Sequence, residues 1–367
     1  MEWLLVASAL LLAFVNGAND NLKGMATLIG SGTLRYRQAL GLATASTALG
    51  SLSSILLATA LVKVFSAKGL VPPEFLDVAF LAGVACAAAL TVLAATLMGM
   101  PVSTTHALLG GIVGAGFATA GSAIDLGALA SGFALPLLVS PFLAIALALS
   151  LQRGGASLMR RGGIGGQSCV CLAPADRVVA GNAELAQLAI TAPDRPELLV
   201  ARSEECRAHG AAGLQVGHAV SFAHVASGSL VCFARGLNDT PKIVGLLMGA
   251  SLLEPLSASI AVGGCMALGG IVAARKVTRT LATRLTPMSP GQGLAGNLTA
   301  SLLVIGASNL GLPVSTTHVS VGGIFGVGAS TGGLRMRATI EVLVSWLVTL
   351  PVSGLVAALL TTRFAVL

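Results

Sequence analysis

The chain has 367 residues, of which 55% are hydrophobic and only 10% are charged. Soluble domains carry about a quarter charged residues, and the mean hydropathy here is +0.90, so a soluble globular protein is excluded. The formal net charge of +7 calls for no nucleic-acid partner, because the basic residues gather in short segments between apolar stretches. We therefore expect an all-α polytopic protein of the cell membrane, embedded in the lipid bilayer.

Apolar stretches alternate with short polar segments along the chain. Several are long enough to cross roughly 30 Å of hydrocarbon as helices. Between the fourth and fifth stretches the sequence becomes Gly-rich and charged, as in a connector. The expected organisation is a first transmembrane repeat at 1–151, a polar connector at 152–211 and a second transmembrane repeat at 212–367. The apolar stretches cover residues 3–18, 38–62, 76–98, 124–151, 214–237, 255–274, 291–309 and 338–362.

Two motifs occur once in each half. The segment "PVSTTH" follows Met100 and recurs after Leu312, with glycines at matching positions downstream. The segment "NGANDNLKG", which begins at Asn16, corresponds to "RGLNDTPKI", which begins at Arg235. Because the matches keep one order, the sequence indicates that the halves are copies of each other.

The distribution of basic residues predicts the orientation, because Lys and Arg accumulate in cytoplasmic loops. With five crossings per half, counting 101–120 and 313–332 as crossings or paired half-helices, only Lys63, Lys68 and Arg363 lie outside. An odd number of crossings inverts the second repeat, puts both termini outside and leaves the connector cytoplasmic. With four crossings per half, the repeats would instead be parallel and Arg160 and Arg161 would lie outside. The residues predicted inside are Arg35, Arg37, Arg153, Arg160, Arg161, Arg275, Lys276, Arg279, Arg284, Arg335 and Arg337.

The "PVSTTH" segments have the pattern of a helix start. Proline suits the first turn of a helix, and an adjacent Ser or Thr can cap it. Within a membrane, such a start offers backbone N–H groups, the positive end of the helix dipole and three hydroxyl groups to an anion. The alternative is that the hydroxyl groups only satisfy backbone carbonyls while the Gly-rich helices pack.

An acidic residue lies in an apolar segment of each half. Asp20 and Asp239 are costly in hydrocarbon, so they indicate a functional site. Lys23 and Lys242 stand three positions later and can pair with them on the same helix face. A purely structural ion pair in each half is the competing interpretation.

Together these residues resemble the inorganic phosphate transporter (PiT) family of phosphate and sulfate permeases. "GANDNLKG" and "GLNDTPKI" are similar to that family's duplicated G-x-N-D signature, and both "PVSTTH" segments match its hairpin motif. The resemblance implies an all-α fold of two inverted pseudo-symmetric repeats, each with a broken helix and a re-entrant helical hairpin. It also implies a homodimer that imports inorganic phosphate by cation symport and alternating access, with sulfate permease as the alternative function.

The resemblance further implies a substrate-binding site without catalytic residues, resident metal or organic cofactor. The coupling ion would be H⁺ or Na⁺. The residues that match the family's substrate-binding positions are Asn19, Asp20, Ser103, Thr104, Thr105, Asn238, Asp239, Ser315, Thr316 and Thr317.

One departure from the family pattern concerns the coupling ion. Sodium-coupled members typically have an Asn three residues after the Asp, and here Lys23 and Lys242 take that place. A Lys ammonium cannot coordinate a cation, but it can supply the same charge. Lys23 and Lys242 are therefore expected to compensate charge, and a proton is favoured over sodium. A sodium site near Asp20 and Asp239 remains the alternative.

Other residues leave alternatives open. His106 and His318 could donate to the anion or complete the hairpin, and Arg235 could add positive charge to the site or only pair with Asp239. A membrane hydrolase using Ser103, His106 and a carboxylate is a remote alternative, because the motif lacks a nucleophile elbow such as G-x-S-x-G. The sequence contains no Walker-type loop for ATP-driven transport, and saturable uptake would distinguish a transporter from a channel.

Overall fold

The computed structural model describes residues 1–173, 197–202, 204, 213–250 and 253–366. It divides into two compact units, one formed by residues 1–152 with 224–367 and a smaller one formed by residues 153–223. Most of both predicted repeats therefore lies in a single helical unit. Much of the predicted connector, at 174–196 and 205–211, lies outside the described residues.

The smaller unit contains a three-stranded antiparallel sheet. Its strands are β1 (Ser168–Ala173), β2 (Glu197–Arg202) and β3 (Gly213–Gln215), in the order β2-β1-β3. Val170 in the central strand lies opposite Val200 on one side and Leu214 on the other. This sheet was not expected from the sequence.

The first half of the helical unit begins with a broken helix and ends with a long one. Two single-turn elements, η1 (Pro73–Phe75) and η2 (Gly121–Ala123), lie in its loops, and the π-helical segment η3 (Ala130–Ala134) joins its last two helices. The helices are α1 (Glu2–Asp20), α2 (Lys23–Gly30), α3 (Tyr36–Leu57), α4 (Thr59–Phe65), α5 (Val78–Met98), α6 (Thr104–Ala120), α7 (Leu126–Leu129) and α8 (Leu135–Arg161).

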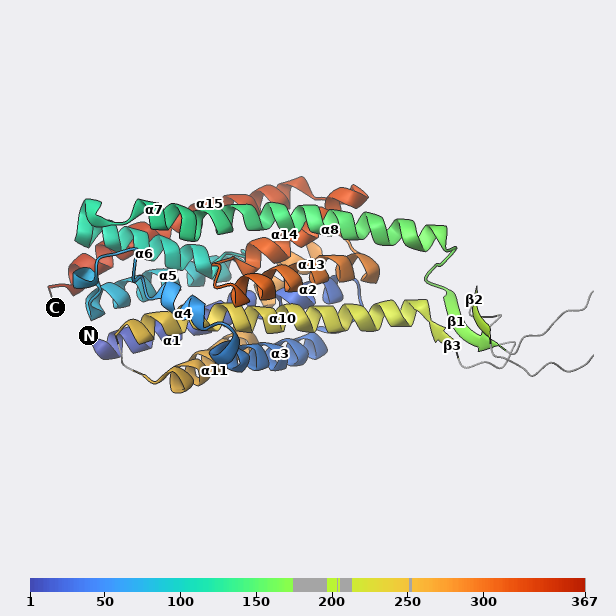
Figure 1. Ribbon diagram of the computed structural model, residues 1–367, viewed down its shortest axis with the longest axis horizontal. Coiled ribbons are helices and arrows are strands. Elements are labelled where there is room, and N and C mark those ends of the chain that lie inside the picture. Colours follow the sequence, from blue (N-terminus) through green and yellow to red (C-terminus); the bar gives the residue numbers. More distant parts are fainter. Residues whose placement is uncertain (174–196, 203, 205–212, 251–252, 367) are drawn as a thin grey trace, which may run out of the picture. The chain divides into compact units, whose positions relative to one another are not determined.

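The second half repeats this order of elements. Helix α10 takes the place of α1 and α2, and the later helices follow with α12 in the place of the short α4. Figure 1 shows that α1 runs away from the end where both termini lie, whereas α10 runs toward that end. The helices are α10 (Val216–Gly249), α11 (Pro255–Ala273), α12 (Arg275–Thr283), α13 (Pro290–Asn309), α14 (Thr316–Thr331) and α15 (Met336–Phe364).

Seven segments of the described chain are long and apolar enough to cross a membrane. Large apolar side chains project from them, and Leu56, Phe142 and Leu347 are 82%, 70% and 77% exposed. Such exposure is costly in water and favourable in lipid, so these segments make the chain a multi-pass membrane protein. The 20-residue α13, at the predicted stretch 291–309, is not among the seven. The seven are Glu2–Gly30, Tyr36–Leu57, Val78–Met98, Leu126–Arg161, Val216–Gly249, Pro255–Ala273 and Met336–Phe364.

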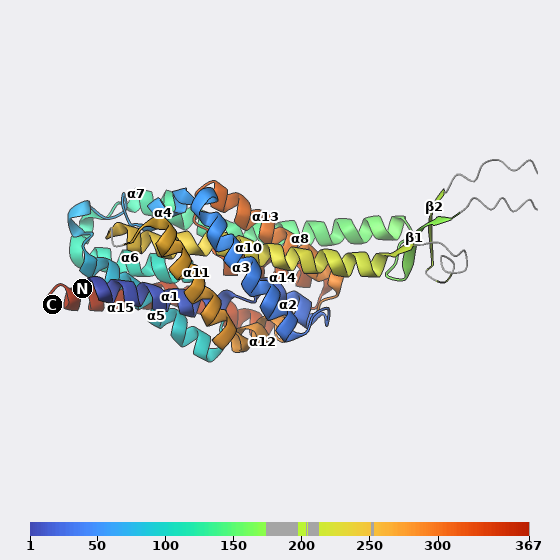
Figure 2. The same ribbon diagram turned by 90° about the horizontal axis from the view of Figure 1, so that it is seen from below.

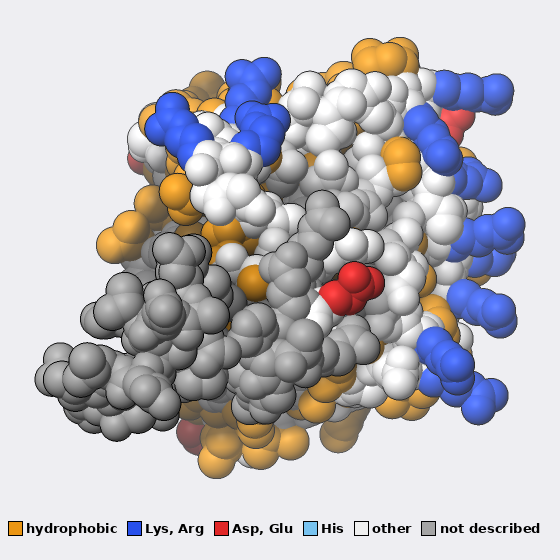
Figure 3. Space-filling model, turned by 90° about the vertical axis from the view of Figure 1, so that its right-hand side faces the viewer, with side chains coloured by type: hydrophobic (Ala, Val, Ile, Leu, Met, Phe, Trp, Pro, Cys, Tyr) orange, Lys and Arg blue, Asp and Glu red, His pale blue; other side chains and the backbone are white. Residues whose placement is uncertain are grey.

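Figure 3 shows Lys and Arg side chains along the edges of the face that it draws. In the helical unit, the residues predicted inside the cell at the ends of α3, α12 and α15 are all exposed. They are Arg35, Arg37, Arg275, Lys276, Arg279, Arg284, Arg335 and Arg337.

The first helix of each half differs in continuity. In the first half, α1 ends at Asp20 and α2 begins at Lys23, with Leu22 between them in a non-helical conformation (φ −102°, ψ 14°). In the second half, α10 continues through Pro241. A proline removes only one helical hydrogen bond, and membrane helices tolerate this where neighbouring helices satisfy the freed group. The expected broken helix is thus present in the first half, while the second half keeps a continuous, proline-containing helix.

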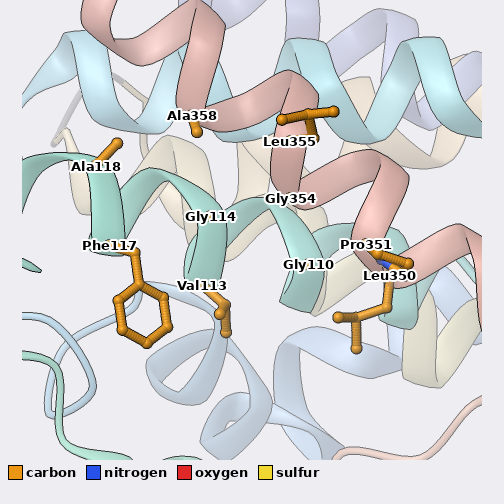
Figure 4. Close-up of a pocket in the computed structure, with 10 residues that line it drawn as sticks. All are labelled: Gly110, Val113, Gly114, Phe117, Ala118, Leu350, Pro351, Gly354, Leu355 and Ala358. Carbon is orange, nitrogen blue, oxygen red and sulfur yellow. The ribbon is translucent and has the colours of Figure 1, made fainter.

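Helices α6 and α14, which begin at the two "PVSTTH" motifs, are the hairpin helices of the two halves. Glycines let each hairpin helix pack against the last helix of the other half. A methyl group added to Gly114 of α6 would lie 2.0 Å from the carbonyl oxygen of Gly354 in α15. Figure 4 shows these helices side by side, with a largely apolar pocket along their contact. In the same way, a methyl group on Gly326 of α14 would lie 2.4 Å from the carbonyl oxygen of Ile145 in α8. Helix α1 packs against both α5 and α11, as Figure 2 also shows.

Candidate functional site

Both "PVSTTH" segments are helix starts, as predicted. Ser103 is the N-cap of α6, and its Oγ accepts a hydrogen bond from the backbone N–H of His106 at 3.1 Å. Ser315 caps α14 in the same way, accepting from His318 N–H at 3.1 Å. The side-chain oxygens of the two serines therefore cap their own helices. The N–H groups of the first helical turn have no intrahelical acceptor and face the region ahead of each helix.

The two helix starts meet each other. Thr105 Oγ1 donates to the carbonyl oxygen of Val314 at 3.3 Å, and Thr317 Oγ1 donates to the carbonyl oxygen of Val102 at 2.7 Å. These reciprocal hydrogen bonds join the motif of one half to the motif of the other. The positive ends of two helix dipoles therefore converge on one buried region.

The Asn residues of the duplicated Asn-Asp pairs form hydrogen bonds with the chain segments that lead into the two "PVSTTH" motifs. Asn19 donates to Thr96 Oγ1 at 2.9 Å and accepts from the Val102 N–H at 3.1 Å. Asn238 donates to the carbonyl oxygen of Val314 at 3.3 Å and accepts from Ser308 Oγ at 3.2 Å. Both amides are thus engaged with the chain entering α6 or α14.

Each lysine of the site reaches the helix start of the opposite half. Lys242 Nζ lies 3.1 Å from Asp239 Oδ1 and donates to Thr105 Oγ1 at 2.6 Å. Lys23 pairs with Asp20 and donates to Thr317 Oγ1. Both predicted Asp–Lys ion pairs are present, and the lysines also link the two halves.

The two carboxylates of the site have different surroundings. Asp239 accepts hydrogen bonds from Asn238 at 3.1 Å and from Asn16 and Thr316 at 3.4 Å, besides its pair with Lys242. Asp20 is 1% exposed and pairs with Lys23, and no other donor of the described chain bonds to its oxygens. The duplicated sequence has therefore produced an asymmetric site.

Arg235 adds a third cation to this region. Its guanidinium donates to Asn16 Oδ1 and, at 3.3 Å, to Asn21 Oδ1 in the break between α1 and α2. Its Nε lies 3.7 Å from Asp239 Oδ2, and a further N–H group donates to Thr47 Oγ1 at 3.4 Å. Arg235 both adds positive charge and pairs with Asp239. Three cations and two carboxylates give the region a formal charge of +1.

Sequence reasoning missed four polar residues that hold the site together: Asn16, Asn21, Thr47 and Thr96. A signal for Thr96 was available, because Thr96 and Ser308 are as far apart in sequence as the two "PVSTTH" motifs. Thr47 gave no comparable signal, since its place beside Arg235 depends on the packing of α3 against α10.

The motif histidines lie beside the charged cluster. His318 stacks on Trp346 with ring centroids 3.9 Å apart, and its ring lies 4.3 Å from that of His106. His106 Nδ1 is 3.1 Å from Ser103 Oγ, the oxygen that caps α6. Asp20, the acidic residue of the first Asn-Asp pair, pairs with Lys23 and takes no part in this contact. The contacts therefore give the Ser–His pair a capping role.

The arrangement suits an anion better than a transition metal. Buried N–H groups, threonine hydroxyl groups and a formal positive charge all favour binding of an oxyanion. Within the described residues, no group of three His, Cys, Asp or Glu side chains could hold a metal ion. The paired carboxylates could accept a proton or a monovalent cation alongside the anion.

A family model described as the phosphate transporter family matches residues 16–357 of this chain. The chain belongs to this phosphate transporter family. The matched range contains both Asn-Asp pairs, both "PVSTTH" motifs and all three buried cations. The family resemblance inferred from the motifs is thereby confirmed.

Individual relatives extend the similarity over nearly the whole chain. A probable low-affinity inorganic phosphate transporter of Mycobacterium bovis is 28% identical over 97% of this chain and 75% of its own length. One of Bacillus subtilis is 26% identical over 97% and 95%. The sodium-dependent phosphate transporter 1-A of Danio rerio is 32% identical over 41% of this chain and 25% of its own length.

A solved structure, described as the sodium-dependent phosphate transporter, has the same fold. It matches with a TM-score of 0.73 and 20% sequence identity, over 100% of this chain and 99% of its own. At this level of identity the match establishes the fold alone. It confirms the all-α polytopic architecture expected from the sequence.

Proposed function

We propose that this phosphate transporter family member imports inorganic phosphate as a proton-coupled secondary active symporter that works by alternating access. The observation that carries the proposal is the convergence of two capped helix N-termini on a buried cluster of three cations and two carboxylates. Helix N-termini and cations favour an anion, and a buried carboxylate can take up a proton. The cluster thus has the groups to bind both partners of a symport.

Phosphate is favoured over sulfate as the substrate. The mycobacterial and Bacillus relatives are named as probable low-affinity inorganic phosphate transporters. In addition, the oxygens of Asp20 have no hydrogen-bond donor among the described residues besides the ammonium group of Lys23. A protonated phosphate can donate a hydrogen bond to a carboxylate, whereas fully ionised sulfate only repels it. Sulfate remains the alternative substrate because it is also a tetrahedral oxyanion.

A proton is favoured over sodium as the coupling ion. The ammonium group of Lys242 lies 2.8 Å from the carbonyl oxygen of Val314, and that of Lys23 lies 3.4 Å from the carbonyl oxygen of Val102. Sodium would require such oxygens together with the carboxylates of Asp20 and Asp239. Since the lysines contact these groups, they supply the positive charge themselves.

Alternating access fits the relation between the halves. Helices α1 and α10 run in opposite directions (Figure 1), as expected for inverted repeats. Reciprocal hydrogen bonds between the "PVSTTH" motifs join the halves at the site. Exchanging the conformations of the two halves would therefore move the access route from one side of the membrane to the other.

The proposed topology follows the positive-inside rule. The exposed basic residues at the ends of α3, α12 and α15 would face the cytoplasm, both termini would lie outside and the connector would be cytoplasmic. We also expect a homodimer. Light scattering of the purified, detergent-solubilised protein measures this, and a mass equal to one 36.4 kDa chain would contradict it.

Counter-flow in proteoliposomes tests the substrate assignment. Vesicles preloaded with unlabelled phosphate should accumulate labelled phosphate transiently, with saturation and with little competition from external sulfate. Empty liposomes provide the background. Counter-flow of sulfate that phosphate does not inhibit would refute phosphate as the substrate.

A further inference from the structure

A second cavity lies in the helical unit, between α4 and the helices α3, α10 and α11. Its volume is about 550 Å³. Besides apolar groups, its lining contains four hydroxyl-bearing residues and two lysines. These polar lining residues are Ser54, Thr59, Lys63, Ser66, Lys68 and Ser259.

The two lysines give this cavity a positive charge. Lys63 and Lys68 are both exposed, and no acidic residue lines the cavity among those that the structure describes. Neither lysine forms an ion pair with a carboxylate of the described chain. Cations in a cleft with low-dielectric walls raise the local concentration of anions and their association rate.

One turn of α10 contributes residues both to this cavity and to the proposed phosphate site. Pro241 and Val244 line the cavity, whereas Lys242, between them in sequence, contacts Asp239 and Thr105. The two surfaces are thus different faces of one helical segment.

Phe65 of α4 lies at the boundary between the cavity and the site. It is fully buried, and its ring centroid lies 5.7 Å from Lys242 Nζ. Val62 of the same short helix and Ser66, its C-cap, line the cavity. Helix α4 therefore presents polar and apolar groups to the cavity and the aromatic ring to the site.

We infer that this cavity is a vestibule in which Lys63 and Lys68 capture free phosphate before it passes α4 to the transport site. The inference rests on the proposed function. In the proposed topology, α10 runs toward the side of the two termini, so the vestibule serves the outside (Figure 1). The lysines act on the encounter with the anion and leave the later transport steps unchanged.

Charge reversal at single lysines tests the vestibule. We expect Lys63→Glu and Lys68→Glu to raise the KM for phosphate uptake by about 10-fold at low ionic strength, with kcat unchanged, and the difference to shrink in high salt. Arg363→Glu is the matched control, because it makes the same change of charge at an exposed position outside the cavity. An unchanged KM in the lysine variants, or an equal rise in Arg363→Glu, would overturn the inference.

Two further experiments distinguish the possible causes of a change in KM. If the lysines held a lipid headgroup phosphate instead, the KM effect would require phosphatidylglycerol in the vesicles, and this would overturn the inference. An equal effect in phosphatidylcholine alone supports capture of free phosphate. Lys63→Gln should give a smaller rise in KM than Lys63→Glu, and an unchanged kcat shows that each variant is folded. Wild-type protein that fails to take up phosphate would refute the proposed function, whereas active wild type with unaffected variants refutes only the vestibule.

Discussion

At the scale of single residues, the unequal partners of Asp20 and Asp239 divide their roles. Asp239 lies between Lys242 and Arg235 and accepts several hydrogen bonds, all of which stabilise the ionised carboxylate. Asp20 has the single partner Lys23. We therefore expect Asp239 to remain an anion through the cycle and Asp20 to be the group that takes up and releases the coupled proton.

Replacing the two carboxylates should give different results. Asp20→Asn cannot carry a proton, so it should retain phosphate counter-flow while losing accumulation driven by a pH gradient. Each variant also leaves a buried lysine without its carboxylate, Lys23 in Asp20→Asn and Lys242 in Asp239→Asn, which costs about 3–5 kcal/mol of stability. Only Asp239→Asn should still respond to the pH gradient, because Asp20 remains to take up the proton. Uptake assays and thermal unfolding in detergent measure these effects. Gradient-driven accumulation by Asp20→Asn would assign the proton to another group.

The threonines that begin α6 and α14 should contribute to anion binding. Thr104→Val and Thr316→Val should each weaken phosphate binding by about 1–3 kcal/mol, because a buried polar group loses its partner. Equilibrium binding of labelled phosphate measures the effect. Thr119→Val is the matched control, since among the described residues its hydroxyl bonds only to the carbonyl oxygen of Ala115 within α6. Wild-type affinity in both motif variants would leave these hydroxyl groups with a packing role.

Much of the site's composition could be predicted at the residue scale. Duplication singled out Asp20, Asp239 and the two lysines because chance rarely places charged groups at matched positions in apolar sequence. Duplication could not predict that Lys23 contacts Thr317, since the sequence does not show how close the two halves lie in space. The different surroundings of the two carboxylates also depend on tertiary packing.

At the scale of helices, the crossed packing of the two halves is the main feature. The pairs α6 with α15 and α14 with α8 each bring glycines of one half against the backbone of the other. Close backbone approach replaces the hydrophobic driving force that is absent within lipid. Each hairpin helix is therefore fixed to the opposite half.

Enlarging one of these glycines should destabilise the protein. Gly114→Ala would place a methyl group 2.0 Å from Gly354 O, and such overpacking typically costs about 1–3 kcal/mol. Gly41→Ala in α3 is the control, because a methyl group there meets nothing within 4 Å, and Ala should stabilise the helix by about 0.5–1 kcal/mol. In thermal unfolding in detergent, only Gly114→Ala should have a lower midpoint temperature than the wild-type protein. Equal midpoints for both variants would mean that α6 and α15 can separate without cost.

Helix positions were easier to predict than helix breaks. The apolar stretches locate the long helices, because hydrocarbon requires both length and apolar composition. The continuity of α10 through Pro241 was not predictable, since neighbouring helices satisfy what the proline removes. Helix α12 is amphipathic but too polar to stand out as an apolar stretch, and α4 begins within the predicted stretch 38–62, so neither was expected as a separate helix.

At the scale of the whole chain, duplication has produced one helical unit with a charged centre. Its two halves share one order of elements, which the repeated motifs anticipated. The three-stranded sheet at residues 168–215 was not anticipated, because its strands are short and lie in a Gly-rich, charged segment. The buried charge of +1 belongs to the whole unit, since both halves contribute to it.

This buried charge leads to a prediction about the driving force of transport. With two lysines beside the carboxylates, we expect that no sodium ion is needed to offset the charge of the anion. If a proton accompanies phosphate inward, acidifying the outside supplies more of the coupled ion and must accelerate uptake. Collapsing the pH gradient with a protonophore must then abolish accumulation above equilibrium.

The measurement is phosphate uptake into proteoliposomes in sodium-free choline buffer at two external pH values. Wild-type protein should concentrate phosphate faster at the lower external pH and should not respond to added sodium. The paired variant Lys23→Asn with Lys242→Asn removes both ammonium groups and supplies oxygens that a cation can bind. It should lose sodium-independent uptake. Wild-type uptake that begins only when sodium is added, and that ignores the pH gradient, would show that the lysines do not replace the coupling cation.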